Sequence, residues 1–405
     1  MTQAIVRAAT SGEIERAAAI AMIAFETEKI DQWIESYNCI ADNAGLEYIV
    51  VVEADGEIVA SLICTPGAVR FTDDIVPFSS VGCVATLPEQ RQHGYAGMMM
   101  SESVRILHRN GYHTSALWPF SYSYYRKFGW EVGAEARKYR VPCELASTLA
   151  EPKNMRPALK NDLPAIAGLV DRFARRYNCV TIRDEFWQKC RYIPSECRFD
   201  GNNNINESKC PWVHETSGEI DGYVDFKVVR REDDAYIRIA EIITETPNAR
   251  NVILSKLATI DVPNIIFLAP MDDGFPQELP NPKAVKVEVE AGFQFRVVNP
   301  LAALELRSVD PDIKGLFGFT VSDPVLGVTD FDVEIIDGKI SKVNTRAKER
   351  LSISIQTFSQ LYCGYVSPSR AAELSRVEAT SDKAINFADG LFKTVLPFRS
   401  YVEYG

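Results

Sequence analysis

The sequence predicts a chain of three domains, in which two similar α/β domains stand in tandem and a smaller α+β domain follows them. A chain of 405 residues is too long for one hydrophobic core. Segments of the first part recur in the same order later in the chain, and the sequence changes character after about Phe293. We therefore expect domains at 1–148, 149–290 and 291–405.

The composition is typical of a globular protein, with 46% hydrophobic and 24% charged residues. The net charge of -11 argues against nucleic acid as a main partner, because phosphate binding needs a basic surface. No apolar run approaches the ~20 residues that span a bilayer. Residues 1–20 carry acidic side chains where a signal peptide would be apolar. We expect a cytoplasmic protein with no membrane partner.

The cysteines predict buried thiols rather than a disulfide framework or a metal site. Their number, nine, is odd, and they are spread from Cys39 to Cys363. One region gathers four cysteines and a histidine without the paired C-x2-C spacing that is typical of zinc sites. These residues are Cys179, Cys190, Cys197, Cys210 and His214.

Three sequence segments that recur in the same order support the tandem arrangement. Arg7 and Glu13, ahead of an alanine-rich helix, lie 149 positions before Arg156 and Asp162. Strand–turn–strand patterns follow at 48–67 and 210–229. Pro88 and Arg91 then match Pro247 and Arg250 at a spacing of 159, and an apolar strand follows each.

The third domain is indicated by apolar strands at 315–323 and 331–343, with a turn at Asp337 and Gly338. The amphipathic segment "SISIQTFSQLYCGY" predicts a helix that ends near Gly364.

The segment with the clearest chemistry connects a strand to a helix. Residues 79–86 read as a strand, Pro88 ends it, and a helix is expected from Tyr95 to Asn110. The free N–H groups and the positive end of that helix suit a pyrophosphate, and Gly94 would allow close approach. A tight turn without a ligand is the alternative. In the matching position of the second copy stands Ile253, so we expect that domain to be structural.

The pattern R-x-x-G-x-A after a strand resembles the acetyl-CoA signature of the GNAT N-acetyltransferases. The segment "YYRKFGW" at 124–130, a second GNAT-like domain without the signature and a third α+β domain are similar to the Eis-like (enhanced intracellular survival) acetyltransferases. Their third domain resembles sterol carrier proteins. The resemblance covers essentially the whole chain in order.

The resemblance implies a role for each matching residue. Strand backbone groups would hold the pantetheine arm, a loop would cradle the pyrophosphate, and two residues would flank the thiol end of acetyl-CoA. Tyr125 would be the general acid, and the terminal carboxylate of Gly405 the base. The tail ends in glycine where the family tends to be aromatic, so Glu403 or Tyr404 could act or position the terminus instead. The cofactor-binding residues would be Val84, Ala85 and Thr86, then Gln92, His93, Gly94, Tyr95, Ala96 and Gly97, and finally Phe120 and Ser121.

We therefore expect an acetyl-CoA-dependent N-acetyltransferase that acetylates a primary amine by direct attack in a ternary complex. The acceptor classes are an aminoglycoside, a polyamine or a lysine-type amine. Glu26, Glu28 and Asp31 are candidates for an acidic acceptor site, with a solvated helix face as the alternative.

The competing hypotheses are a lipid-binding protein and a scaffold with a vestigial acetyltransferase. The resemblance implies a hexamer, and the cysteine spacing argues against a metal.

Overall fold

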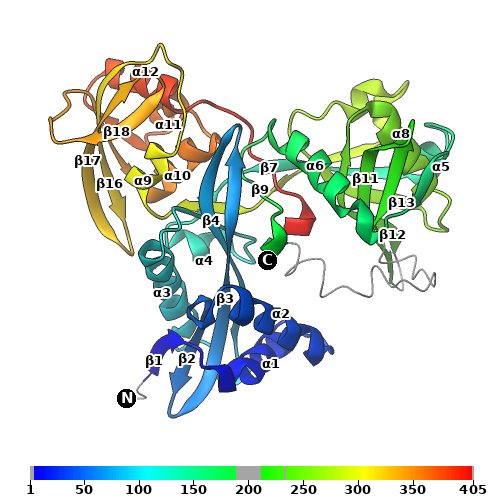
Figure 1. Ribbon diagram of the computed structural model, residues 1–405, viewed down its shortest axis with the longest axis horizontal. Helices are drawn as coiled ribbons and strands as arrows, with labels where there is room; N and C mark the ends of the chain where they lie inside the picture. Colours follow the sequence, from blue (N-terminus) through cyan, green and yellow to red (C-terminus); the bar gives the residue numbers. More distant parts are fainter. Residues whose placement is uncertain (1–3, 188–210, 232–233, 404–405) are drawn as a thin grey trace.

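The computed structural model describes residues 4–187, 211–231 and 234–403, which form three lobes (Figure 1). Each lobe is built on its own sheet with helices, so the prediction of two α/β domains and an α+β domain is confirmed. The C-terminal segment returns from the third lobe and ends between the other two. Within the described residues, no helix is long and apolar enough to cross a membrane.

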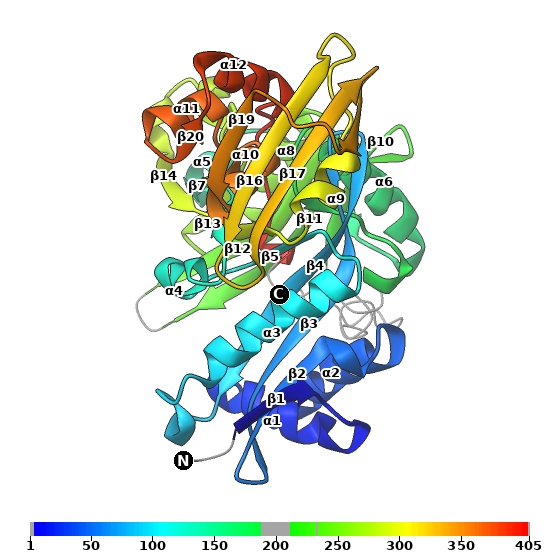
Figure 2. The same ribbon diagram turned by 90° about the vertical axis from the view of Figure 1, so that its left-hand side faces the viewer.

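The first sheet is antiparallel except for one parallel pair, β4 with β5. Its strands, in spatial order, are β1 (Ala4–Ala8), β2 (Ile49–Ala54), β3 (Glu57–Phe71), β4 (Asp74–Thr86), β5 (Thr114–Leu117), β15 (Gln294–Val297) and β6 (Glu131–Val132), and β9 (Val180–Thr181) pairs with β3. Helix α3 (Tyr95–Arg109) covers one face, and α1 (Ile14–Ala24) and α2 (Ile30–Asn43) cover the other (Figure 2). The buried side of α3 includes Met99, Met100, Val104 and Leu107.

The second sheet repeats this plan, with β12 and β13 as its parallel pair. Its strands, in spatial order, are β14 (Lys286–Ala291), β7 (Glu135–Pro142), β13 (Asn264–Ala269), β12 (Ala235–Thr244), β11 (Glu219–Arg230), β10 (Trp212–Thr216) and β8 (Met155–Pro157). Among its described residues, the helices of this domain include α5 (Cys143–Ala146), α6 (Leu163–Ala174) and α8 (Pro247–Leu257).

The two sheets exchange strands. Strand β7 belongs in sequence to the segment expected for the first domain, 1–148, but lies between β13 and β14 of the second sheet. Strand β15 follows the second domain and lies between β5 and β6 of the first. The boundaries expected at 148/149 and 290/291 therefore do not follow sheet membership. Hydrophobic alternation indicates that a segment is a strand, but it does not indicate which sheet the strand joins.

The sequence repeat that matches Arg7 with Arg156 corresponds to an ion-pair cluster that is present in both domains. Arg7 contacts Glu13 at 2.6 Å and Glu53 at 2.7 Å, tying β1 to β2 and to the turn before α1. In the second domain, Arg156 binds its matching carboxylates, Asp162 at 2.6 Å and Glu215 at 2.5 Å. The internal repeat predicted from sequence is thus present in the packing.

The third lobe is a five-stranded sheet backed by helices. Its strands, in spatial order, are β18 (Lys339–Val343), β17 (Gly327–Ile336), β16 (Gly315–Asp323), β19 (Arg350–Ser354) and β20 (Val377–Ala379). Its helices are α9 (Pro300–Glu305), α10 (Ile355–Cys363), α11 (Pro368–Glu373) and α12 (Asp382–Leu391). Helix α10 ends at Gly364, as predicted.

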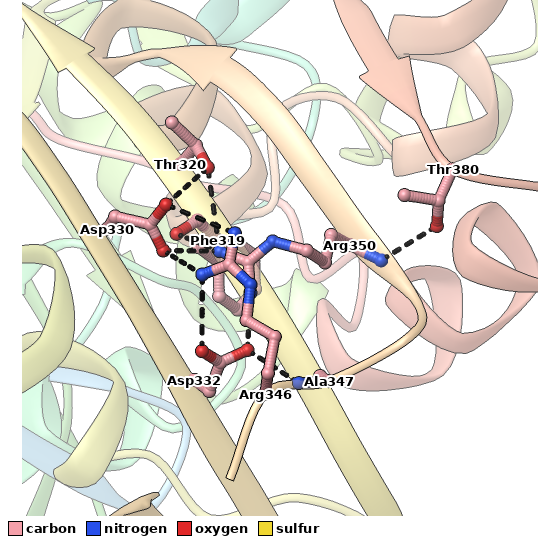
Figure 3. Close-up of polar contacts among 8 residues, drawn as sticks. All are labelled: Phe319, Thr320, Asp330, Asp332, Arg346, Ala347, Arg350 and Thr380. Carbon is pink, nitrogen blue, oxygen red and sulfur yellow. Dashed lines mark hydrogen bonds and ion pairs between the residues drawn. The ribbon is translucent and has the colours of Figure 1, made fainter. Parts of the chain in front are cut away.

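The two faces of this third sheet differ. Aromatic rings fill the covered side, with Phe319 contacting Phe317, Phe331 and Phe358 at centroid distances of 5.1, 5.3 and 5.7 Å. The other side carries a network in which Arg350 pairs with Asp330 and Asp332 (Figure 3). The sheet therefore has a filled apolar interior and charges that neutralise one another.

Candidate active site

Strands β4 and β5 separate at the centre of the first sheet. They pair only from Phe78↔Thr114 to Ser80↔Ala116, whereas β4 continues to Thr86. Among the described strands, only β3 pairs with this last part of β4, so its other edge presents unpaired backbone groups. The predicted residues Val84, Ala85 and Thr86 lie on that edge.

A β-bulge lies at the start of the free edge. Across the β3–β4 pair, Ser61 faces Ala85 and Ile63 faces Gly82, so one residue of β3 opposes two residues of β4. Cys83, within the bulge, has a φ of +54°. Such a bulge bends the strand and redirects its side chains and carbonyls. Here it lies in the part of β4 that continues beyond its last pair with β5, Ser80↔Ala116.

The N-terminus of helix α3 (the mouth of α3) lies beside the gap between β4 and β5 and has no side-chain cap. Gly94 is its N-cap residue, with a left-handed φ of +83° that only glycine adopts readily. A Cβ on Gly94 would have no atom within 4 Å, so the space in front of it is open. The first N–H groups of α3 have no partners within the helix, and the helix dipole adds positive charge there. This is an anion-binding geometry.

The loop residues ahead of α3 contribute unequally. His93 is exposed, its ring stacks on Tyr95 at 5.5 Å, and its Nδ1 lies 3.2 Å from the carbonyl of Gln90. The Tyr95 side chain is buried, so at this place Tyr95 can offer its backbone N–H but not its phenol. Gln92 is exposed with a φ of +68°. Ala96 and Gly97 form the first turn of the helix.

Tyr125 lies on the short helix α4 (Tyr122–Arg126), next to the same opening. Its ring contacts Phe120 at 5.3 Å and Tyr124 at 5.2 Å. Burial raises the pKa of the Tyr125 phenol above its ordinary value of 10, so the phenol keeps its proton at neutral pH. Phe120 is 76% exposed although it is aromatic, and Ser121 precedes the helix as its N-cap residue.

The α3 mouth and α4 adjoin each other. Tyr124 contacts Phe128 at a centroid distance of 5.5 Å, and a Cβ on Gly97 would lie 3.4 Å from the Phe128 ring. The structure thus brings together the free edge of β4, the mouth of α3 and Tyr125.

A cavity of about 650 Å³ opens on the α2 side of the β4 bulge. Glu28 is in its wall, while Glu26 and Asp31 are not among the residues that line it. The indole of Trp33 donates a hydrogen bond to the Thr27 hydroxyl at 2.6 Å. Sequence reasoning missed Trp33, Thr65 and Cys83, because they come from a helix and two strands that only the fold brings together. The lining residues are Thr27, Glu28, Lys29, Gln32, Trp33, Ser36, Ile40, Ile63, Thr65, Gly82 and Cys83.

The C-terminal tail is anchored near this site. The backbone N–H and hydroxyl of Thr181 donate to the Glu403 carboxylate at 3.2 and 2.8 Å, and Arg399 pairs with it at 3.1 Å. Glu403 is buried and engaged in these contacts, an arrangement that suits a residue that holds the chain end better than one that acts as a base. Tyr401 packs against Trp118, just after β5, at 6.4 Å. Tyr404 and Gly405 lie outside the described residues.

The cysteine-rich region gives no support to a metal site. The described part of the chain contains no group of three or more His, Cys, Asp or Glu side chains that could hold a metal ion. Cys179 is buried as a free thiol, and His214 pairs with Asp221 at 2.6 Å. Cys39, expected as a buried thiol, instead forms a disulfide. The remaining members of the region, Cys190, Cys197 and Cys210, lie outside the described residues.

Comparison with family models agrees with this geometry. Models described as acetyltransferase (GNAT) domains match residues 5–133 and 180–297, and a sterol carrier protein domain model matches residues 300–400. The chain is a GNAT acetyltransferase. It has two GNAT domains in tandem and a C-terminal sterol carrier protein domain, as the sequence predicts.

Several solved structures share the whole arrangement. A probable N-acyltransferase from Enterococcus faecalis is 21% identical over 98% of this chain and 100% of its own, with a TM-score of 0.79. A GCN5-related N-acetyltransferase from Anabaena variabilis is 18% identical over 98% of both chains (TM-score 0.77). Eis1 from Mycobacterium abscessus is 18% identical over 98% of this chain and 99% of its own (TM-score 0.72). These identities establish a shared fold. A search of curated protein sequences found no significant match.

The second GNAT domain differs at the corresponding place. Residues 87–94 separate β4 from α3, but only Glu245 and Thr246 separate β12 from α8. Arg250, which matches Arg91 in sequence, therefore lies inside a helix, where it pairs with Asp273 and Glu278. The two copies thus differ by more than the change from Gly94 to Ile253, because residues matching the loop have become helix.

Proposed function

We propose that the first GNAT domain binds acetyl-CoA and transfers its acetyl group to a primary amine held in the cavity beside the β4 bulge. The observation that carries this proposal is the convergence of the free β4 edge, the uncapped mouth of α3 and the protonated Tyr125. The open space before Gly94 and the exposed ring of Phe120 fit a cofactor lying between β4 and β5.

Each residue has a separate task. The backbone of Val84, Ala85 and Thr86 would hold the pantetheine arm, and the N–H groups from Gln92 to Gly97 would hold the pyrophosphate. Phe120 and Ser121 would flank the thioester. Acetyl-CoA supplies the activated acetyl group and a thiolate leaving group. Tyr125 would donate the proton to that thiolate, and the terminal carboxylate of Gly405 would take the proton from the ammonium acceptor.

The cavity favours a cationic acceptor. Glu28 offers a carboxylate and Trp33 an aromatic ring, and both attract ammonium groups. Lys29 in the same wall would oppose a compact dication and favour an extended amine with its charge near Glu28. Polyamines, aminoglycosides and lysine-type amines all meet this description, so the acceptor class is the first thing to measure.

The decisive experiment follows thiol release from acetyl-CoA with spermidine, kanamycin and Nα-acetyl-lysine. We expect turnover with at least one amine and a loss of about 100-fold in kcat for Tyr125→Phe, a typical effect of removing a general acid. A chain extended beyond Gly405 should lose turnover as well. If both variants release thiol as fast as wild type, the mechanism is wrong. If wild type releases no thiol with any amine, the result favours a scaffold with a vestigial acetyltransferase.

The lipid-binding reading has less support. The interior of the sterol carrier protein domain is filled by aromatic rings, with Phe358 and Phe392 in contact at 5.8 Å. Hexameric assembly and a cytoplasmic location are also part of the proposal. A monomeric mass at micromolar concentration would reject the assembly.

A further inference from the structure

The segment from Tyr122 to Val132, which carries Tyr125, is held from outside by long polar side chains. Five of its backbone carbonyls accept hydrogen bonds from residues of β15 and α10, more than 160 positions later in the chain. Gln294 Nε2 donates to the carbonyls of Tyr122 (3.1 Å) and Trp130 (3.4 Å). Gln356 Nε2 donates to that of Arg126 (2.9 Å), Arg296 Nη1 to that of Phe128, and Gln360 Nε2 to that of Val132 (3.0 Å).

Arg296 is the centre of this arrangement and is completely buried. Its second Nη pairs with Asp323 at the end of β16, so its charge is neutralised by the third domain. Asp323 also accepts from the N–H of Val325 at 2.8 Å and is fixed by that turn. A buried arginine with both ends engaged is costly to move, since a shift would leave a charge without its partner.

Gly129 makes room for this arginine. Its φ is +91°, and a Cβ at that position would overlap the Arg296 guanidinium. The glycine that ends "YYRKFG" is therefore required for both conformation and space.

Helix α4 needs such support. It has only five residues, and a helix of that length is not stable by itself. Tyr125 is its fourth residue, and Arg126, whose carbonyl accepts from Gln356, is its last. Catalysis by a positioned proton donor is sensitive to displacements of about 1 Å.

We propose that β15 and α10 position Tyr125 for catalysis, which gives the sterol carrier protein domain an active-site role through Gln356 and through Asp323, the partner of Arg296 on β15. This inference rests on the proposed role of Tyr125 as general acid. Gln356 is a positioning residue, because it reaches Tyr125 only through the backbone of Arg126.

The test uses Gln356→Met, which nearly keeps the side-chain volume but removes the donor at a half-buried position. With the best amine of the three above, we expect kcat to fall about five- to tenfold, the cost of one hydrogen bond. The KM for acetyl-CoA should stay within twofold. Gln356→Arg, which keeps a donor, should recover most of the rate, and Gln277→Met on the exposed surface of the second domain is the control.

A double-mutant cycle separates positioning from general damage. In a Tyr125→Phe background, Gln356→Met should have no further effect on kcat. An equal loss in both backgrounds, or no loss in wild type, would overturn the inference while leaving the role of Tyr125 intact. If Tyr125→Phe alone matches wild type, the proposed function fails and the inference with it.

A measurement independent of turnover completes the test. Amide hydrogen exchange of the peptide 122–132 should be faster in Gln356→Met, and that of 91–100 unchanged. Unchanged exchange in both peptides would contradict the inference even if no amine in the panel is acetylated.

Discussion

The two GNAT domains share a sheet plan and an ion-pair cluster, yet they differ at the mouth of the helix that follows the splayed strands. In the first domain α3 begins after an eight-residue loop, 87–94, and its first N–H groups lack a side-chain cap. In the second, Thr246 caps α8 by accepting from the N–H of Ala249 at 3.1 Å. A capped mouth has less to offer an anion, because one of its donors is already satisfied. The comparison shows that the anion-binding geometry at the start of α3 is not repeated at the start of α8, although the sheet plan is shared.

Both domains contain two parallel strands that pair over a short stretch and then separate. Strands β12 and β13 pair only from Tyr236↔Asn264 to Arg238↔Ile266, as β4 and β5 do over three residues. Beyond that point the second domain has a cavity of about 240 Å³, whose wall includes Arg250, Asp273 and Glu278. The separation of the strands therefore does not distinguish the two domains. They differ in the loop before the helix and in the N-terminus of that helix.

The largest effect is expected from replacing Gly94 with the residue that matches it in the sequence repeat, Ile253. Gly94→Ile places a β-branched side chain at φ +83° and in the space where an anion would approach. We expect acetyl-CoA to bind about 100-fold more weakly, which corresponds to about 2.7 kcal/mol. Isothermal titration with CoA measures this directly. The matched control is Glu245→Gln at the mouth of the second domain, which should leave CoA affinity unchanged.

Gly94→Ile could also disturb folding, so its melting temperature is needed beside its affinity. Weak binding by a chain that melts like wild type supports the anion site. Wild-type affinity in a folded variant would mean that the loop is only a tight turn.

Sequence reasoning predicted much of this molecule because its signals were local. The start of α3, the end of α10 at Gly364 and the repeat that matches Arg7 with Arg156 each depend on residues that are close in sequence or repeated in it. The strand exchange could not be predicted, since β7 and β15 read as ordinary strands wherever they pair. The same holds for Arg296, whose partner carbonyl at Phe128 is 168 residues away.

The conversion of loop into helix was missed for a different reason. Pro88 and Pro247 align at one spacing, so the alignment carried Gly94 onto Ile253. In the structure Pro88 begins a short 3-10 helix (Pro88–Gln90), whereas Pro247 is the first residue of α8. A proline suits both positions, and its presence does not decide between them.

A smaller effect is expected from opening the second mouth. Thr246→Ala removes the cap of α8 and should lower the free energy of unfolding by about 1 kcal/mol. Because that mouth takes no part in the proposed reaction, kcat and the KM for acetyl-CoA should not change. Urea unfolding and the thiol-release assay on the same preparation check both statements. A loss of turnover without a loss of stability would give the second domain a function that its geometry does not suggest.

The smallest effect concerns the ion-pair clusters that the domains share. Hydrogen bonds from Arg7 lower the pKa of Glu13 from its ordinary 4.5 to about 2, and those from Arg156 lower that of Asp162. A carboxyl whose pKa is lowered by folding stabilises the native state above its unfolded pKa, and this contribution is lost as the pH falls towards the folded value. Glu13→Gln should thus cost stability at pH 7, by less than about 1 kcal/mol for a partly exposed cluster, and progressively less as the pH falls from 5 towards 2. Asp162→Asn should behave the same way in the second domain.

Urea unfolding at pH 7, 5 and 3 measures the difference in unfolding free energy between each variant and wild type. A difference that is independent of pH in either variant would mean that the cluster acts through packing, and the two domains would then no longer share an electrostatic anchor.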